Sequence, residues 1–136
     1  MAKQLPTDLR LLDEIYRRYV GAFSDFDEET NKTRSTKIWM PIDIEALAKH
    51  FGTDPDMIFG RLYYHLKGKY RQPMKDGDLE FFQMRIGGDR HCVNFPFLAS
   101  VLADLREERR RFVVATRIAA LSLAISLVSI LVAVLT

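Results

Sequence analysis

Residues 43–66 read DIEALAKHFGTDPDMIFGRLYYHL, and this stretch decides the fold of the first part of the chain. Asp43 is placed to cap a helix that ends at Gly52, since glycine readily adopts the left-handed conformation at a helix C-terminus. Asp54 and Pro55 are placed to begin a second helix, with the aspartate as its cap and the proline in its first turn. The stretch therefore predicts two helices joined by a tight turn.

The apolar side chains of these two helices predict a shared core. Leu47 and Phe51 lie on one face of the first helix, and its small Ala48 lets the second helix cross closely. In the second helix Ile58, Leu62 and Leu66 recur at a spacing of four, which extends the helix to about residue 71.

The segments before this stretch predict a helix, a loop and a strand. Apolar residues with a period near 3.6 indicate a helix over residues 7–24. The polar segment 24–37, which begins with an acidic cluster at residues 25–29, is typical of a loop. Residues 37–40 predict a short strand that Pro41 ends or places at a sheet edge.

The segments after it predict a hairpin and a last helix. Residues 79–86 alternate as in a strand, with Phe82, Met84 and Ile86 on one face. A turn at residues 87–90 leads into a second strand over residues 91–95, and Pro96 opens the last helix. Together with residues 37–40, these strands predict a three-stranded sheet.

This order of elements, with the motif of Ile44, Leu47, Ala48, Phe51 and Gly52, resembles the winged helix-turn-helix superfamily over about residues 7–96. The resemblance implies an α+β domain whose hairpin forms the wing. In DNA-binding relatives the second helix of the motif enters the major groove, and the wing contacts the phosphate backbone. The same fold also serves as a protein-interaction module.

Nucleic-acid binding would use basic and aromatic side chains on that helix and on the wing. The candidate residues are Arg61, Tyr64, Lys67, Lys69, Arg71, Arg85 and Arg90. Asp54 and Asp56 argue against this role, because they lie at the helix end that normally approaches DNA and would repel phosphates. The basic residues at the other end also complement the helix dipole without any ligand.

Composition excludes several classes of function. Residues 1–112 carry 19 basic and 18 acidic side chains, a balance that excludes a strongly basic coat protein and an acidic tail protein. The single cysteine, Cys92, excludes a disulfide framework and a cysteine-rich zinc site. His50 and His65 have no Cys, Asp or Glu at a recognised metal spacing, and no phosphate-binding glycine loop is present. His91 and Cys92 are adjacent in a predicted strand, so they would point to opposite faces and could not act as a dyad. We expect no enzyme activity, no metal and no cofactor.

The end of the chain predicts a membrane span. Residues 118–136 contain no charge, glycine or proline, and at about 1.5 Å per residue a helix of that length nearly crosses the hydrocarbon layer. We expect a cytoplasmic domain at 1–96, a juxtamembrane helix at 97–112 and a transmembrane helix at 113–136. Basic residues on the N-terminal side of the span predict a single-pass, tail-anchored chain with a cytoplasmic N-terminus; these interface residues are Arg106, Arg109, Arg110, Arg111 and Arg117.

Small residues follow heptad spacing along the span. They are Ala115, Ala119, Ser122, Ser126, Ser129 and Ala133. Small side chains let helix backbones approach closely in lipid, so this seam predicts packing against a second copy or against another transmembrane helix. Ala120 and Ala124 lie off the seam.

Two functions are compatible with these features. The first is a membrane-anchored accessory or adaptor subunit whose winged-helix domain binds a membrane or cytoplasmic protein. The second is a membrane-tethered winged-helix regulator that binds DNA. If the last helix is continuous, residues 106–111 leave only about 9 Å between domain and bilayer. A duplex would approach an anionic leaflet at that distance only against electrostatic repulsion, which favours the adaptor.

Overall fold

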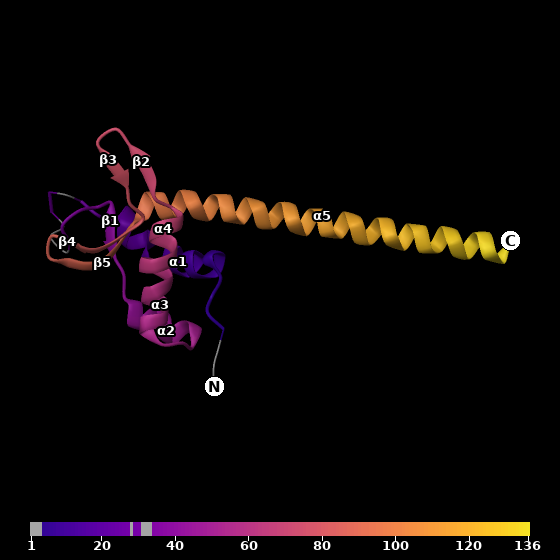
Figure 1. The fold of residues 1–136 in the computed structure, drawn as a ribbon, viewed down its shortest axis with the longest axis horizontal. Coiled ribbons are helices and arrows are strands. Elements are labelled where there is room, and N and C mark those ends of the chain that lie inside the picture. The colour runs from indigo at the N-terminus through magenta and orange to yellow at the C-terminus, as the bar shows by residue number, and fades with distance from the viewer. Residues whose placement is uncertain (1–3, 28, 31–33) are drawn as a thin grey trace. The chain divides into compact units, whose positions relative to one another are not determined.

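The structure is a computed structural model that describes residues 4–27, 29–30 and 34–136. Residues 28 and 31–33, which belong to the predicted polar loop, lie outside the described part. The chain falls into two units, Met1–Leu102 and Ala103–Thr136, which are described separately. The first unit holds all the short helices and strands, and the second holds most of one long helix (Figure 1).

The first helices begin and end at the residues that the sequence provides for this purpose. Helix α1 (Asp8–Ser24) starts after Thr7, whose hydroxyl accepts a backbone N–H of the first turn. Helix α2 (Ile44–Phe51) is capped in the same way by Asp43, and Gly52 ends it with a φ of 67°. These predicted helices are confirmed.

The second helix of the motif has a hydrogen-bond pattern that the sequence did not reveal. Helix α3 (Pro55–Gly60) starts after Asp54 as predicted, but the next six residues form a π-helix, η1 (Arg61–Leu66), followed by α4 (Lys67–Lys69). The backbone N–H at position 67 bonds to the carbonyl five residues earlier, at position 62. The wider turn changes which side chains lie above one another after Gly60.

The expected three-stranded sheet is present. Strands β1 (Trp39–Pro41), β5 (Asp89–Asn94) and β4 (Phe82–Ile86) form an antiparallel sheet in the order β1-β5-β4. Val93 at its centre lies opposite Met40 on one side and Phe82 on the other. The chain therefore folds into a mixed helix-and-sheet unit.

A second hairpin corrects the prediction of one strand over residues 79–86. Strands β2 (Gln72–Met74) and β3 (Gly77–Leu79) form a separate two-stranded sheet, which Figure 1 shows beside α4. The following residues, Phe81 and Phe82, are both fully buried, which departs from the alternation of buried and exposed residues predicted for this stretch. The chain therefore leaves one sheet at residue 79 and enters the other at Phe82.

The core joins α1, α2, α3 and η1 to the three-stranded sheet and to the beginning of α5. Its largest fully buried side chains are Leu11, Leu12, Ile15, Leu47, Ile58, Leu62, Leu66, Phe81, Phe82, Phe95, Leu98 and Leu102.

Helix α5 (Phe95–Leu135) runs without interruption for 41 residues. Its most apolar 18-residue window has a mean hydropathy of 2.8 and no buried residue. By length and composition, α5 is the one helix among the described residues that could cross a membrane.

Gly87 lies in the β4–β5 turn. Its backbone conformation and the closeness of a neighbouring side chain both require glycine at this position. Its φ is +59°, and an added Cβ would lie 2.6 Å from the hydroxyl oxygen of Ser35. We expect Gly87→Ala to lower the free energy of unfolding by about 1–2 kcal/mol, because both the conformation and the space are wrong for a side chain. Urea unfolding of the full chain in detergent micelles, followed by the fluorescence of its single tryptophan, measures this loss.

Gly88→Ala is the matched control, because a Cβ at Gly88 meets no atom within 4 Å. Equal stability losses in the two variants would show that Gly87 has no special role.

Candidate functional site

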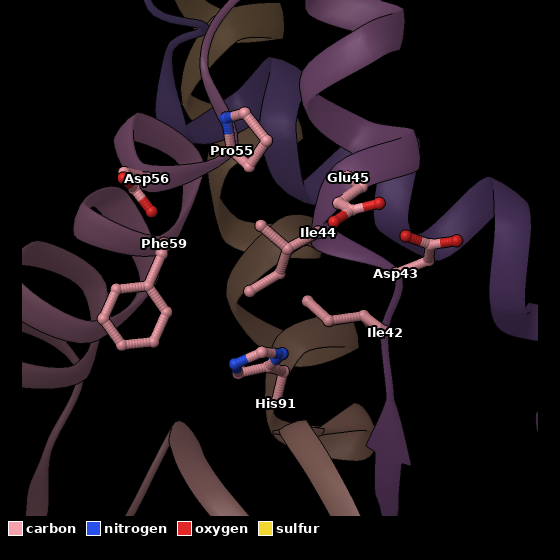
Figure 2. Close-up of a pocket in the computed structure, with 8 residues that line it drawn as sticks. All are labelled: Ile42, Asp43, Ile44, Glu45, Pro55, Asp56, Phe59 and His91. Atoms are coloured by element: carbon pink, nitrogen blue, oxygen red, sulfur yellow. The ribbon is translucent and has the colours of Figure 1, made fainter.

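The described part of the first unit contains a pocket of about 370 Å³ between the start of α2, the start of α3 and strand β5. Its lining residues, drawn in Figure 2, are Ile42, Asp43, Ile44, Glu45, Pro55, Asp56, Phe59 and His91. The starts of α2 and α3 both line this pocket. The pocket is therefore built from the segment that most strongly determines the fold.

The pocket has an apolar base and an acidic rim. Ile42 and Ile44 form the base and are each 6% exposed. Figure 2 shows the carboxylate of Asp56 on one side of Ile44 and that of Glu45 on the other. Asp43, beside Glu45, already has a hydrogen-bond partner, because its side chain caps α2 and accepts the Ala46 N–H at 3.0 Å.

His91 enters the pocket from β5 with an unusual backbone. Its φ of 54° lies in the left-handed region, although it is not a glycine. Its ring stacks on Phe82 at 6.4 Å and meets the edge of Phe59 at 5.7 Å between centroids. Burial and the charge of Arg90 lower the pKa of His91, which favours the neutral ring.

Two further aromatic rings on the helix contact Phe59 of the pocket. The Phe59 ring stacks on Tyr63 at 5.3 Å and meets Tyr64 edge-on at 6.3 Å between centroids. An α-helix brings residues three and four apart together, whereas the π-helix also brings Tyr64, five residues on, beside Phe59. Sequence reasoning missed this aromatic wall, although the aromatic residues at 59, 63 and 64 were a visible signal.

Cys92, the neighbour of His91, is fully buried. Burial raises the pKa of its thiol to about 11. The thiol therefore stays protonated at neutral pH. No cluster of three or more metal-binding side chains occurs among the described residues.

The structure brings three basic groups of the second motif helix onto one carboxylate of α1. Asp8 accepts hydrogen bonds from Arg61 and, at 3.1 Å, from Lys69. The ring nitrogen Nε2 of His65 lies 3.3 Å from the same carboxylate. Burial acts to raise the pKa of Asp8, but the Lys69 hydrogen bond and the Arg61 charge outweigh it and lower the pKa. Two of the seven candidate nucleic-acid contacts are therefore engaged within the protein.

Arg71 is engaged in the same way. Its side chain donates to Asp78 of β3, with an Nε–Oδ2 distance of 2.6 Å, and lies 3.9 Å from Glu80. This pair links the end of the helical segment to the second hairpin, which the sequence did not predict.

The remaining candidate contacts lie on separate parts of the surface. The Lys67 ammonium lies 4.9 Å from the centre of the Tyr63 ring, and Tyr64 is 76% exposed. Arg85 and Arg90 are exposed and stand opposite each other across β4 and β5. They carry two like charges at the β4–β5 hairpin.

The residues predicted to contact membrane or other helices lie along α5. The seam residues from Ala115 to Ala133 are all exposed in the second unit. The hydroxyls of Ser126 and Ser129 donate to carbonyls four residues earlier, at 2.9 and 3.0 Å. Among the interface arginines, Arg110 and Arg111 both donate to Glu107.

Glu14 links α1 to the C-terminal end of α2. It is 8% exposed and accepts hydrogen bonds from Arg17 and, at 2.7 Å, from Arg18, while His50 Nε2 lies 3.5 Å away. The hydrogen bond from Arg17 is the main cause that lowers the pKa of Glu14 to about 2, below its ordinary value of 4.5. Sequence analysis did not single this residue out.

The Glu14 pKa predicts acid sensitivity. Because the folded-state value is lowered, the stabilisation is complete above about pH 4.5 and is lost as the pH falls towards 2. We expect Glu14→Gln to lower the free energy of unfolding at pH 7 by about 1–3 kcal/mol. The difference from the unmodified chain should shrink towards pH 2, as urea titrations at several pH values would show.

The exposed Glu108 provides the control, since Glu108→Gln removes the same charge from an open surface. A pH-independent difference between the Glu14 variant and the unmodified chain would contradict the assigned role.

Comparison of the chain with protein-family models, with curated proteins and with solved structures finds no match.

Proposed function

We propose that the chain is a membrane-anchored accessory or adaptor subunit whose cytoplasmic winged-helix domain binds a protein partner. The order helix, strand, helix, helix and hairpin supports the winged-helix assignment, as does the β1-β5-β4 sheet. The apolar part of α5 would cross the membrane and pack with other transmembrane helices. The arginines at 106, 109, 110, 111 and 117 favour a cytoplasmic position for the domain.

The observation that carries the proposal is the pairing of the basic surface with the chain's own carboxylates. Arg61 and Lys69 bind Asp8, and Arg71 binds Asp78. Phosphates would have to compete with these carboxylates for the same donors. The acidic rim of the pocket also lies at the start of the helix that DNA-binding relatives turn towards the duplex. Both features favour a protein partner.

A specific observation favours the alternative, a membrane-tethered DNA-binding regulator. Lys67, Arg85 and Arg90 have no carboxylate partner in the described part of the chain. Three phosphate contacts would give a slope of about −2.7 in a plot of log affinity against log salt concentration.

Duplex binding by the full chain in nanodiscs of zwitterionic lipid distinguishes the two functions. We expect no binding at near-physiological salt. Binding that persists there, and is lost in Lys67→Glu with Arg71→Glu, would establish the regulator and overturn the adaptor.

Cross-linking in the membrane tests the adaptor directly. A photoreactive residue at Ile118 should trap one partner of defined mass, and Ser122→Leu with Ser126→Leu should abolish the product by blocking close approach of the helices. The control is Ala120→Leu with Ala124→Leu. These positions lie off the seam, so this double variant should still give the cross-linked product. Equal yields from both pairs would contradict packing at the seam.

A further inference from the structure

The pocket presents apolar and aromatic surfaces. Its base is formed by Ile42 and Ile44, and the half-buried ring of Phe59 closes one wall. Figure 2 shows the ring of His91 at the lower end, below Ile44. Because these surfaces are apolar or aromatic, an alkyl chain laid across them would lose part of its contact with water.

The rim carries charge that the protein itself does not neutralise. Asp8, Glu14 and Asp78 each pair with an arginine of this chain. Glu45 and Asp56 are exposed and have no cation partner in the described part of the chain. They complement the positive ends of α2 and α3, which explains their positions but leaves their charge available.

The electrostatic complement of this rim is a cation. His91 is the one basic side chain that lines the pocket, and burial with the charge of Arg90 favours its neutral form. A positive group entering between Glu45 and Asp56 would therefore meet two carboxylates and an aromatic face. No positively charged lining residue would oppose it.

We propose that this pocket receives an arginine side chain from a segment of the partner protein, an inference that rests on the proposed adaptor function. The alkyl stem would lie on Ile42 and Ile44, and the guanidinium would bind the rim carboxylates beside the Phe59 ring. Arginine fits better than lysine, because its planar group stacks on aromatic rings and donates hydrogen bonds in two directions.

The test uses the full chain in nanodiscs and the capped peptide acetyl-Ala-Leu-Arg-Leu-Ala-amide as its probe. Methyl NMR signals of Ile42 and Ile44 should shift and saturate during the titration. The same peptide with neutral citrulline in place of arginine should bind about tenfold more weakly, because it lacks the charge-assisted hydrogen bonds. Equal binding of both peptides, or shifts confined to residues outside the pocket, would overturn the proposal.

The rim variant is Glu45→Gln with Asp56→Asn. We expect this variant to bind the arginine peptide about tenfold more weakly and to bind the citrulline peptide as the unmodified chain does. Asp76→Asn with Glu108→Gln removes the same charge from exposed positions elsewhere and should bind as the unmodified chain does. If both double variants bind the arginine peptide equally weakly, net charge alone explains the effect, and a specific pocket is contradicted.

Two outcomes separate this inference from the proposed function. If the arginine peptide fails to bind while Ile118 still cross-links a partner, the pocket assignment is wrong and the adaptor stands. If the peptide does not bind and the chain holds duplex DNA at physiological salt, the adaptor fails as well. A rim variant that loses self-association would make a second copy of this chain the occupant and overturn the partner assignment.

Discussion

Arginine in place of both Ile125 and Val128 should release the chain from the membrane. Both side chains are exposed on α5, near the middle of its uncharged stretch. Each arginine at the centre of a span opposes insertion by about 2.5–3.5 kcal/mol, so the two together disfavour it by about 5–7 kcal/mol. Membranes washed with alkaline carbonate should retain the unmodified chain and lose the double variant.

Ile125→Leu with Val128→Leu is the control, because it keeps the segment apolar and should leave the chain in the pellet. Retention of the arginine variant after the wash would show that α5 is not the anchor. The prediction depends on the uninterrupted apolar composition of the segment and on no feature of the first unit.

Local signals in the sequence account for the parts of the fold that were predicted correctly. A capping aspartate acts on the residues immediately after it, so Asp43 and Asp54 mark helix starts without knowledge of the remaining structure. Gly52 and Gly87 mark a helix end and a hairpin turn for the same reason, since both have a positive φ. The long apolar segment is a helix by composition alone.

The π-helix and the second hairpin were missed because no pattern in the sequence marks either of them. Nothing in residues 61–66 forbids a regular α-helix, since the buried Leu62 and Leu66 lie at the spacing of four that an α-helix also has. Residues 72–79 pair with each other but are almost entirely exposed, so no apolar alternation marked them as strands.

The candidate site was only partly accessible to sequence reasoning for a related reason. Arg61 and Lys69 had the charge that nucleic-acid binding requires, but their partner, Asp8, lies more than fifty residues earlier in the chain. The pocket likewise joins residues 42–45, 55–59 and 91, which no local motif connects. Charge counts show which groups are available, whereas the fold decides which of them are already paired.

The ring of Phe82 supports both the sheet and the pocket, so Phe82→Ala should have a large effect on stability. The side chain is fully buried and contacts the rings of Phe59, Tyr63 and His91. Its removal leaves a cavity among these groups, and we expect a loss of about 3–5 kcal/mol in the free energy of unfolding. This is a large part of the roughly 5–15 kcal/mol that stabilises a typical domain. Urea unfolding in micelles measures it.

Met84→Ala is the matched control on the same strand, because Met84 is 45% exposed. This substitution should lower the free energy of unfolding by less than about 1 kcal/mol. Similar losses for the two variants would contradict the placement of Phe82 in the core. Phe82→Leu then separates packing from ring contacts, since leucine fills much of the space but cannot stack on His91. If that variant folds but binds the arginine peptide more weakly, the stack on Phe82 positions His91 for the pocket as well as stabilising the sheet.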